Sequence, residues 1–415
     1  MTDGTPANGG AGADSALPPL KPLGAALYRT TELLAAELVR PTPEGPDWSD
    51  FEWRIAEAVA AMHGISPLLA TRLRWHGPAF WQQFIHEQRS HTEERHRRIQ
   101  ALLASIDVVG RHHAVPILAL KGAALHALGL YAPGERPMAD VDLLVRPSDL
   151  RRTAQLLEEL GFLQSETYWK HLTFTPRAPR PAHGLGEHSD NDIKIELHER
   201  IGEILPSRIT DLTGSIFPAH ASPGLNPYPS NAALMLHLLL HAAGALQYRS
   251  LRMLHLHDIA QLAGRMTEND WNEVLRPGGI DRCPWWALPP LTLVARYYPA
   301  AVPPRVLSAL APSCPWRLRW LARHRTLTDV SLSYLWLEAF PGLEWAPSTS
   351  EMLEYAATRT LKAVSLLLRL QASAVQPGTN PPMQFSRRPY ILRWLVARQA
   401  RPETISAVRA ALAQL

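Results

Sequence analysis

The chain has 415 residues, 46% of them hydrophobic, which predicts a globular protein of about two or three domains with sizeable cores. Its net charge of +4 is compatible with phosphate-bearing ligands but is small for a dedicated nucleic-acid binder. The cysteines Cys283 and Cys314 lie far apart, which excludes a disulfide framework or a cysteine-rich zinc site and favours a reducing, cytoplasmic location.

The N-terminal part of the chain is predicted to be a disordered tail followed by helices. Residues 1–20 have no basic segment before an apolar run, so they differ from a signal peptide. Over 21–112, apolar residues recur at the three- and four-residue spacing of amphipathic helices. The stretch HTEERHRR (91–98) is interpreted as a solvated helix face rather than a phosphate-binding patch.

Residues 113–206 are predicted to form a small core of alternating strands and helices. The expected elements, in chain order, are a strand at 115–120, a helix at 123–131, a strand at 140–146, a helix at 147–162, and strands at 168–176 and 192–201. The last strand is the clearest, because apolar residues alternate there with Lys194, Glu196 and His198. This strand therefore has one core face and one polar face.

Residues 207–415 are predicted to be helical again, so the fold class is α+β, a small mixed sheet flanked by helical regions. The longest apolar run, 232–246, is too short to cross a bilayer, and we expect no membrane domain. Arginine and tryptophan interleave over 314–327 and 384–402; these stretches are interpreted as amphipathic helices with the tryptophans inside. The loop at 183–192 is a flexible segment and a candidate cover for a site.

Two aspartates, Asp140 and Asp142, stand at the head of the predicted strand DVDLLVR. Residues i and i+2 of a strand share a face about 7 Å apart, so the two carboxylates project side by side. An isolated pair could simply be solvated, but Glu196 lies on the polar face of a later strand and Arg136 lies just upstream. Converging carboxylates need cations, and Mg²⁺ or Mn²⁺ with oxygen ligands suits phosphoryl or nucleotidyl transfer.

Lysine is scarce in this chain, which has five lysines, and Lys121 follows a predicted strand directly, together with Gly122. An ammonium group in a strand-to-helix turn is a good point-charge partner for a triphosphate. Its alternative is an ordinary surface lysine. Lys121, Gly122 and Arg136 are therefore the candidate nucleotide-binding residues.

A zinc site is the main rival interpretation. His237 and His241 have the i, i+4 spacing that places two imidazoles on one metal, and HLHD (255–258) follows nearby. The glutamate of HExxH is missing, since position 238 is Leu, and packing histidines are the favoured reading. The sequence contains neither the P-loop motif nor GxSxG.

The segments LALKGAALHALGLY, RPMADVDLLVRPSDLRRTAQLLEELGF and IKIELHERI together resemble the uncharacterised nucleotidyltransferase family of bacteria, within the polymerase-beta-like nucleotidyltransferase superfamily. The resemblance runs from about Leu69 to Leu262. It implies a short mixed sheet with helices against one side, metal ligands at Asp140 and Asp142, and a third carboxylate at Glu196. The superfamily's usual Gly-Ser turn is replaced by Lys121-Gly122, so the lysine would take over the phosphate contact.

The resemblance implies a magnesium- or manganese-dependent enzyme that transfers a nucleoside monophosphate or related group from an NTP or nucleotide sugar. The acceptor would be a hydroxyl or phosphate of a small molecule or peptide, including natural products and modified peptides. Substrate-lining candidates are Lys194, His198, His241 and Asp258. Two alternatives stay open: an inactive nucleotide- or peptide-binding protein on the same fold, and a tRNA-modifying enzyme, although nucleic acid is not the expected partner.

Overall fold

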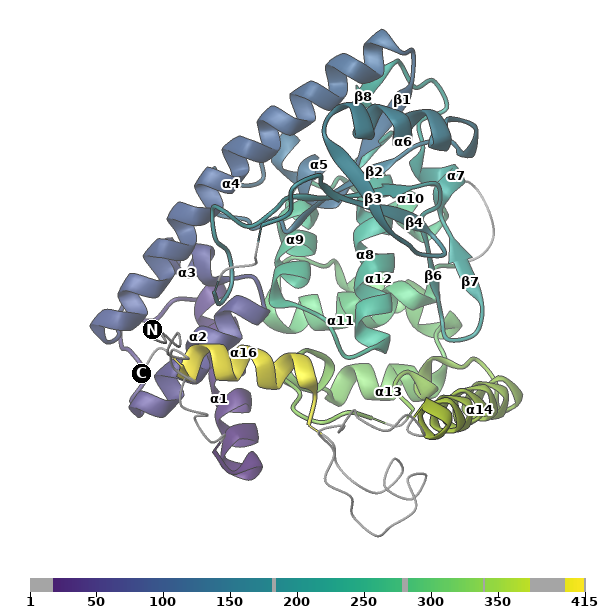
Figure 1. Cartoon of the computed structure of the whole chain (residues 1–415). Helices are drawn as coiled ribbons and strands as arrows, with labels where there is room; N and C mark the ends of the chain where they lie inside the picture. Colours follow the sequence, from purple (N-terminus) through teal and green to yellow (C-terminus); the bar gives the residue numbers. More distant parts are fainter. Residues whose placement is uncertain (1–17, 181–183, 278–282, 339, 374–399, 414–415) are drawn as a thin grey trace, which may run out of the picture.

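The computed structural model describes residues 18–180, 184–277, 283–338, 340–373 and 400–413 (Figure 1). The fold is mixed α+β, as predicted, with helices before and after a six-stranded mixed sheet. The predicted tail lies outside the described residues as far as residue 17, and the first helix begins at Leu20. Within the described parts of the chain, every helix is too short or too polar to span a bilayer.

Among the described residues, four helices precede the sheet: α1 (Leu20–Val39), α2 (Asp50–Met62), α3 (Ser66–Arg72) and α4 (Ala79–His112). The sheet region contains β1 (Pro116–Ala119), α5 (Lys121–Ala127), β2 (Asp140–Leu144), α6 (Leu150–Glu159), β3 (Phe162–Thr167), β4 (His171–Pro176), β5 (Lys194–His198), the hairpin β6 (Gly202–Ile204) and β7 (Ile209–Asp211), α7 (Thr213–Ile216) and β8 (Gly224–Asn226). The following helices are α8 (Asn231–Gln247), α9 (Met253–Ala263), α10 (Glu268–Leu275), α11 (Leu288–Tyr297), α12 (Pro304–Leu310), α13 (Trp316–His324), α14 (Thr349–Ser373) and α16 (Pro402–Leu412).

The strand order in the sheet is β3-β4-β5-β2-β1-β8. Strands β2 and β5 run parallel at its centre, with Asp142 opposite Glu196, whereas β1 and β4 run antiparallel to them. The four predicted strands are confirmed as β1, β2, β4 and β5. Strands β3 and β8 at the two edges were not predicted, because only Phe162 of β3 is buried and β8 has three residues.

The two faces of the sheet differ in chemistry. Val141, Leu143, Ile195 and Leu197 belong to an apolar cluster formed with α4 and α6. Because side chains alternate along a strand, the intervening residues Asp140, Asp142, Glu196 and His198 point to the opposite face. That face is turned toward α8 and α9, which lie below the sheet in Figure 1.

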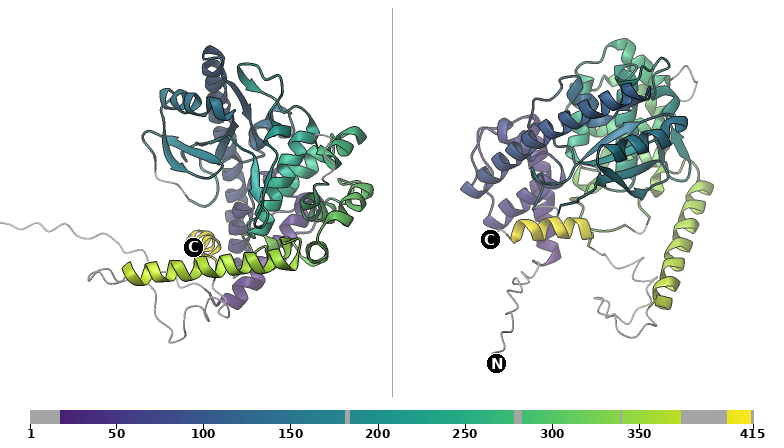
Figure 2. Two further views of the ribbon diagram at one scale, coloured as in Figure 1. Left: turned by 90° about the vertical axis from the view of Figure 1, so that its right-hand side faces the viewer. Right: turned by 45° about the horizontal axis from the view of Figure 1, so that its top comes forward.

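Helix α8 is apolar on all sides and is therefore buried almost throughout; Ser230 caps its N-terminus by accepting the N–H of Ala233. At the other end of the molecule, α16 packs against α2, so the last described helix lies beside the N-terminal ones (Figure 1, Figure 2). The Arg- and Trp-rich stretch 384–402 lies outside the described residues up to 399.

Two expectations about surface helices were wrong. On α13, Trp316 and Trp320 are 66% and 56% exposed, and Leu318 and Ala322 are buried instead. The tryptophan pair and the pair formed by Leu318 and Ala322 both have i, i+4 spacing, so the helical periodicity is compatible with either pair facing the protein interior. On α4, Arg95 is buried rather than solvated, because its guanidinium forms an ion pair with Glu187 and hydrogen bonds to backbone carbonyls.

The ion pair of Arg95 also determines where the predicted cover loop lies. Over the described residues 184–192, the loop is held on α4, where Gln88 accepts the N–H of Glu187 and donates to two loop carbonyls. None of these loop residues lines the cavity below the sheet. This part of the loop is therefore anchored beside the site and does not cover it.

Candidate functional site

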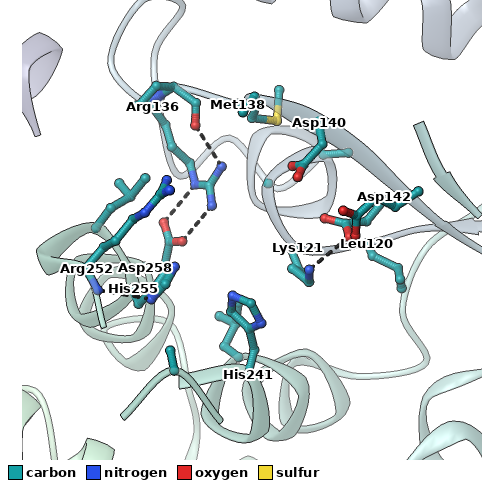
Figure 3. Close-up of a pocket in the computed structure, with 18 of the residues that line it drawn as sticks. Leu120, Lys121, Arg136, Met138, Asp140, Asp142, His241, Arg252, His255 and Asp258 are labelled. Carbon is teal, nitrogen blue, oxygen red and sulfur yellow. Dashed lines mark hydrogen bonds and ion pairs between the residues drawn. The ribbon is translucent and has the colours of Figure 1, made fainter. Parts of the chain in front are cut away.

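A cavity of about 360 Å³ lies between the polar face of β2 and β5 and the helices α8 and α9 (Figure 3). The predicted site residues that line it are Lys121, Gly122, Arg136, Asp140, Asp142, Glu196, His241 and Asp258. The structure thus brings eight predicted residues from distant parts of the sequence to one cavity. Lys194 and His198 do not line it: Lys194 is exposed, and His198 is buried behind Asp142.

Asp142 is buried and doubly hydrogen-bonded. Its Oδ1 accepts from Nζ of Lys121 at 2.9 Å and from Nε2 of His198 at 3.0 Å (Figure 3 draws the lysine bond). A carboxylate can only accept, so Nε2 of His198 carries the proton. Burial alone would raise the pKa of Asp142, but Lys121 and His198 hold that pKa well below its usual value. Asp142 is therefore an anion that is already paired with the ammonium group of Lys121 and hydrogen-bonded to His198.

Asp140 has the opposite environment. Its carboxylate makes no hydrogen bond or ion pair with any of the described residues, although it shares the cavity with Asp142. Burial and the neighbouring charge of Asp142 raise the pKa of Asp140 to about 6. A carboxylate that is disfavoured as an anion and lacks a partner is suited to accept a cation from outside.

Glu196 lies opposite Asp142 in the parallel pair of strands and completes the set of three carboxylates at the cavity. The oxygen atoms of Asp140, Asp142 and Glu196 are the ligand type that Mg²⁺ and Mn²⁺ take. Asp140 has no protein partner to displace among the described residues, whereas Asp142 is already paired with Lys121, and the role of this carboxylate set as metal ligands stays a prediction.

Lys121 begins α5 directly after β1, as the strand-to-helix turn predicted. Its φ of +43° lies in the left-handed region, which is unusual for a residue with a side chain and costs of order 1–3 kcal/mol. The backbone N–H of Lys121 donates to the hydroxyl of Tyr228, which in turn is hydrogen-bonded to Nδ1 of His237. These contacts hold Lys121 in the conformation that brings its ammonium group to Asp142.

Gly122 is required by close packing. A Cβ at this position would lie 2.3 Å from Nη1 of Arg136 and 2.7 Å from Sδ of Met138. Arg136 cannot easily move aside, because Nε and Nη2 donate to the two carboxylate oxygens of Asp258 at 2.8 and 2.7 Å (Figure 3). Asp258 also accepts a hydrogen bond from the hydroxyl of Tyr131. This buried ion pair fixes α9 against the sheet region.

Arg136 is thus engaged by protein, and its role in nucleotide binding stays a prediction. A second cavity arginine, Arg252, has no ion-pair partner among the described residues (Figure 3). It precedes α9, and its backbone N–H donates to Nδ1 of His255. Burial, together with the charge of Arg252, lowers the pKa of His255 well below its usual value, so this cavity imidazole is neutral at pH 7.

The zinc interpretation is not supported by the geometry. Nδ1 of His237 is hydrogen-bonded to Tyr228, and the ring of His241 packs against that of His255 with centroids 4.9 Å apart. Among the residues that the structure describes, the group able to hold a metal through histidine is a different one: His171, Glu196 and His198.

Arg252, Tyr228 and His171 were not predicted from the sequence, and His255 was considered only as part of HLHD in the zinc alternative. Arg252 and His255 belong to LRMLHLHDIAQL, where an arginine directly before a histidine-rich helix is the only local signal. His171 follows from the pairing of β4 with β5, where it lies opposite His198. That long-range pairing has no local sequence signal.

Comparison with known proteins relates the region that contains this cavity to a protein family. The sequence model of a protein family described as "Uncharacterised nucleotidyltransferase" matches residues 49–277, more than half of the chain, including the whole cavity-forming part of the sheet. Searches of curated proteins and of solved structures find no match. The chain therefore belongs to this family of uncharacterised nucleotidyltransferases.

Proposed function

We propose that the chain transfers a nucleoside monophosphate, or a related phosphoryl-linked group, from an NTP or activated nucleotide to a hydroxyl or phosphate of an acceptor. The observation that supports this most is the convergence of three carboxylates, Lys121 and the unpaired Arg252 on one cavity. Carboxylates alone would repel a nucleotide. Carboxylates with a divalent cation, next to a lysine and an arginine, match a nucleotide's triphosphate.

Lys121 and Arg252 are proposed to bind the phosphates. The side chain of Lys121 lines the cavity and is 18% exposed while its ammonium group neutralises Asp142, so a phosphate oxygen can reach it. Arg252 offers a planar fork of donors, which suits two oxygens of one phosphate. Together they would orient the nucleotide and stabilise the charge that develops on the leaving pyrophosphate.

Asp140, Asp142 and Glu196 would hold Mg²⁺ or Mn²⁺, which supplies charge neutralisation and orientation of the phosphate oxygens. His198 keeps Asp142 in place through its hydrogen bond. Glu196 is proposed to accept the proton of the acceptor hydroxyl as that oxygen bonds to the α-phosphorus. The bond from the α-phosphorus to the bridging oxygen breaks, and pyrophosphate leaves.

The test is a screen in which each NTP is supplied with label either at the α- or at the γ-phosphorus, with Mg²⁺ or Mn²⁺. Natural-product and modified-peptide acceptors are included because the family resemblance implies these acceptor classes. Transfer of the α-label, without the γ-label, is the expected result. Asp140→Asn and Glu196→Gln should abolish transfer, whereas the matched control Asp149→Asn, outside the cavity, should not.

Transfer of the γ-label alone would instead make the protein a kinase, and binding without transfer to any acceptor would favour the inactive nucleotide-binding alternative. The exposed Trp316 and Trp320 are the one observation that favours an RNA acceptor, because aromatic rings stack on unpaired bases. We expect no RNA affinity that falls steeply with salt. A steep slope that is lost when Arg317 and Arg323 are replaced by Ala would reverse this expectation.

A further inference from the structure

We propose that His171, Glu196 and His198 form a site for a divalent transition-metal ion beside the carboxylate set of the cavity. In the antiparallel pairing of β4 with β5, His171 lies directly opposite His198. Glu196 is two residues before His198 and therefore projects from the same face. One ligand atom from each of the three residues lies within 4.8 Å of the others.

The distances between the ligand atoms match a coordination shell. Nε2 of His198 lies 3.5 Å from Oε2 of Glu196, and Nδ1 of His171 lies 3.7 Å from the same oxygen. Around an ion with ligands at about 2.1 Å, neighbouring ligand atoms are about 3.0 to 3.4 Å apart. A movement of a few tenths of an ångström would therefore bring each histidine nitrogen to this spacing from the glutamate oxygen, and the two histidine nitrogens lie within 4.8 Å of each other. Asp142, 3.0 Å from Nε2 of His198, is close enough to be a fourth ligand.

Three of the four ring nitrogens of His171 and His198 have no hydrogen-bond partner among the described residues, whereas Nε2 of His198 donates to Asp142. Both ring nitrogens of His171 are buried without a hydrogen bond, and so is Nδ1 of His198. The side chain of His171 is 10% exposed, so water does not readily satisfy it. Unsatisfied buried nitrogens are costly in a folded protein, and a metal ion on one nitrogen of His171 removes part of that cost.

Two imidazoles and one carboxylate select the kind of ion. Nitrogen ligands favour Zn²⁺ and Co²⁺ over Mg²⁺, which prefers oxygen. Nε2 of His198 would release its proton on binding, because a metal-bound imidazole nitrogen carries none. Glu196 lines the cavity, which gives the ion a path from solvent.

This site does not depend on the proposed function. It predicts metal binding without any nucleotide, and it would stand if the chain transferred nothing. Where both hold, Glu196 is shared, and a transition-metal ion would fix the orientation of Glu196 next to the nucleotide.

The test titrates Co²⁺ into the chelator-treated full-length protein without nucleotide, following the visible absorption of Co²⁺ and the heat of binding. One high-affinity site with a spectrum unlike that of hydrated Co²⁺ is expected, and Mg²⁺ should not displace the ion. His171→Ala should lower the affinity for Co²⁺ about tenfold to a hundredfold, a loss typical of a disturbed ligand set. His171→Gln provides a second variant if the Ala variant does not fold.

His220→Ala, which removes an exposed histidine, is the matched control and should bind like wild type. Asp140→Asn should also keep its affinity, because Asp140 is not among the three ligands. Equal Co²⁺ affinity in wild type and in a folded His171 variant would overturn the proposal. A loss in Asp140→Asn as large as that in the His171 variant would also overturn it, by placing the ion on the aspartate pair.

Discussion

Replacing Asp140 by Asn is expected to stabilise the ligand-free protein while removing its activity. Burial and the charge of Asp142 raise the pKa of Asp140 from 3.8 to about 6, so the folded state disfavours this carboxylate as an anion. Each pKa unit corresponds to about 1.4 kcal/mol, and the rise of about two units therefore sets an upper bound of about 3 kcal/mol. Asparagine is uncharged at every pH, so the variant avoids the free-energy cost of burying this negative charge.

The pH dependence follows from the direction of this rise. A carboxyl group whose folded pKa is above its unfolded pKa lowers the free energy of unfolding as the pH rises from the unfolded pKa to the folded one, because over that range the unfolded chain has lost the proton and the folded chain still keeps it. The cost is absent below about pH 4 and complete above about pH 6. The gain from Asp140→Asn should therefore be close to zero at pH 4 and about 1 to 3 kcal/mol at pH 8.

The assay is chemical denaturation at pH 4, 6 and 8 in the presence of a chelator, with Asp149→Asn as the matched control. That control should change the free energy of unfolding by less than about 0.5 kcal/mol, as a substitution away from special features does. A variant no more stable than wild type at pH 8, or equally stabilised at pH 4 and pH 8, would refute the reasoning about Asp140.

Three further substitutions test other parts of the cavity. Arg252→Ala should weaken NTP affinity about tenfold to a hundredfold, as loss of a charge-assisted contact does. The control Arg151→Ala, on the surface, should leave the affinity unchanged. Equal dissociation constants for wild type and Arg252→Ala would remove Arg252 from the site. Asp258→Ala should lower the free energy of unfolding by about 3 to 5 kcal/mol, because Arg136 is left as a buried unpaired charge, and a loss below 1 kcal/mol would contradict this. Gly122→Ala should lower the free energy of unfolding by about 1 to 3 kcal/mol and weaken NTP binding, because the new Cβ would lie 2.3 Å from Nη1 of Arg136. A free energy of unfolding and an NTP affinity equal to those of wild type would show that the site adjusts to the added methyl group.

The sequence predicted the parts of the site that depend on local pattern. Alternation along 192–201 identified Glu196 as facing away from the apolar core, and the strand before Lys121 located the lysine at a strand-to-helix turn. These features repeat within a few residues, so periodicity is enough to find them. The same alternation places Asp140 and Asp142 on the face of the strand opposite to that of Val141.

The features that were missed depend on contacts between distant residues. Arg136 pairs with Asp258, 122 positions later, and His171 meets Glu196 only through strand pairing. No local pattern encodes either contact. On α13 the local pattern was ambiguous, and packing against α11 decided which stripe is buried, leaving Trp316 exposed.

The claim that this cavity is a metal-dependent nucleotide site is tested most directly by calorimetric titration of the full-length protein with a non-hydrolysable NTP analogue and Mg²⁺. The wild type should bind one analogue per chain only when the metal is present. Asp142→Asn should lose most of that affinity, because it removes a negative ligand from the cavity. Binding that is unchanged by this substitution, or binding that does not require the metal, would contradict the account.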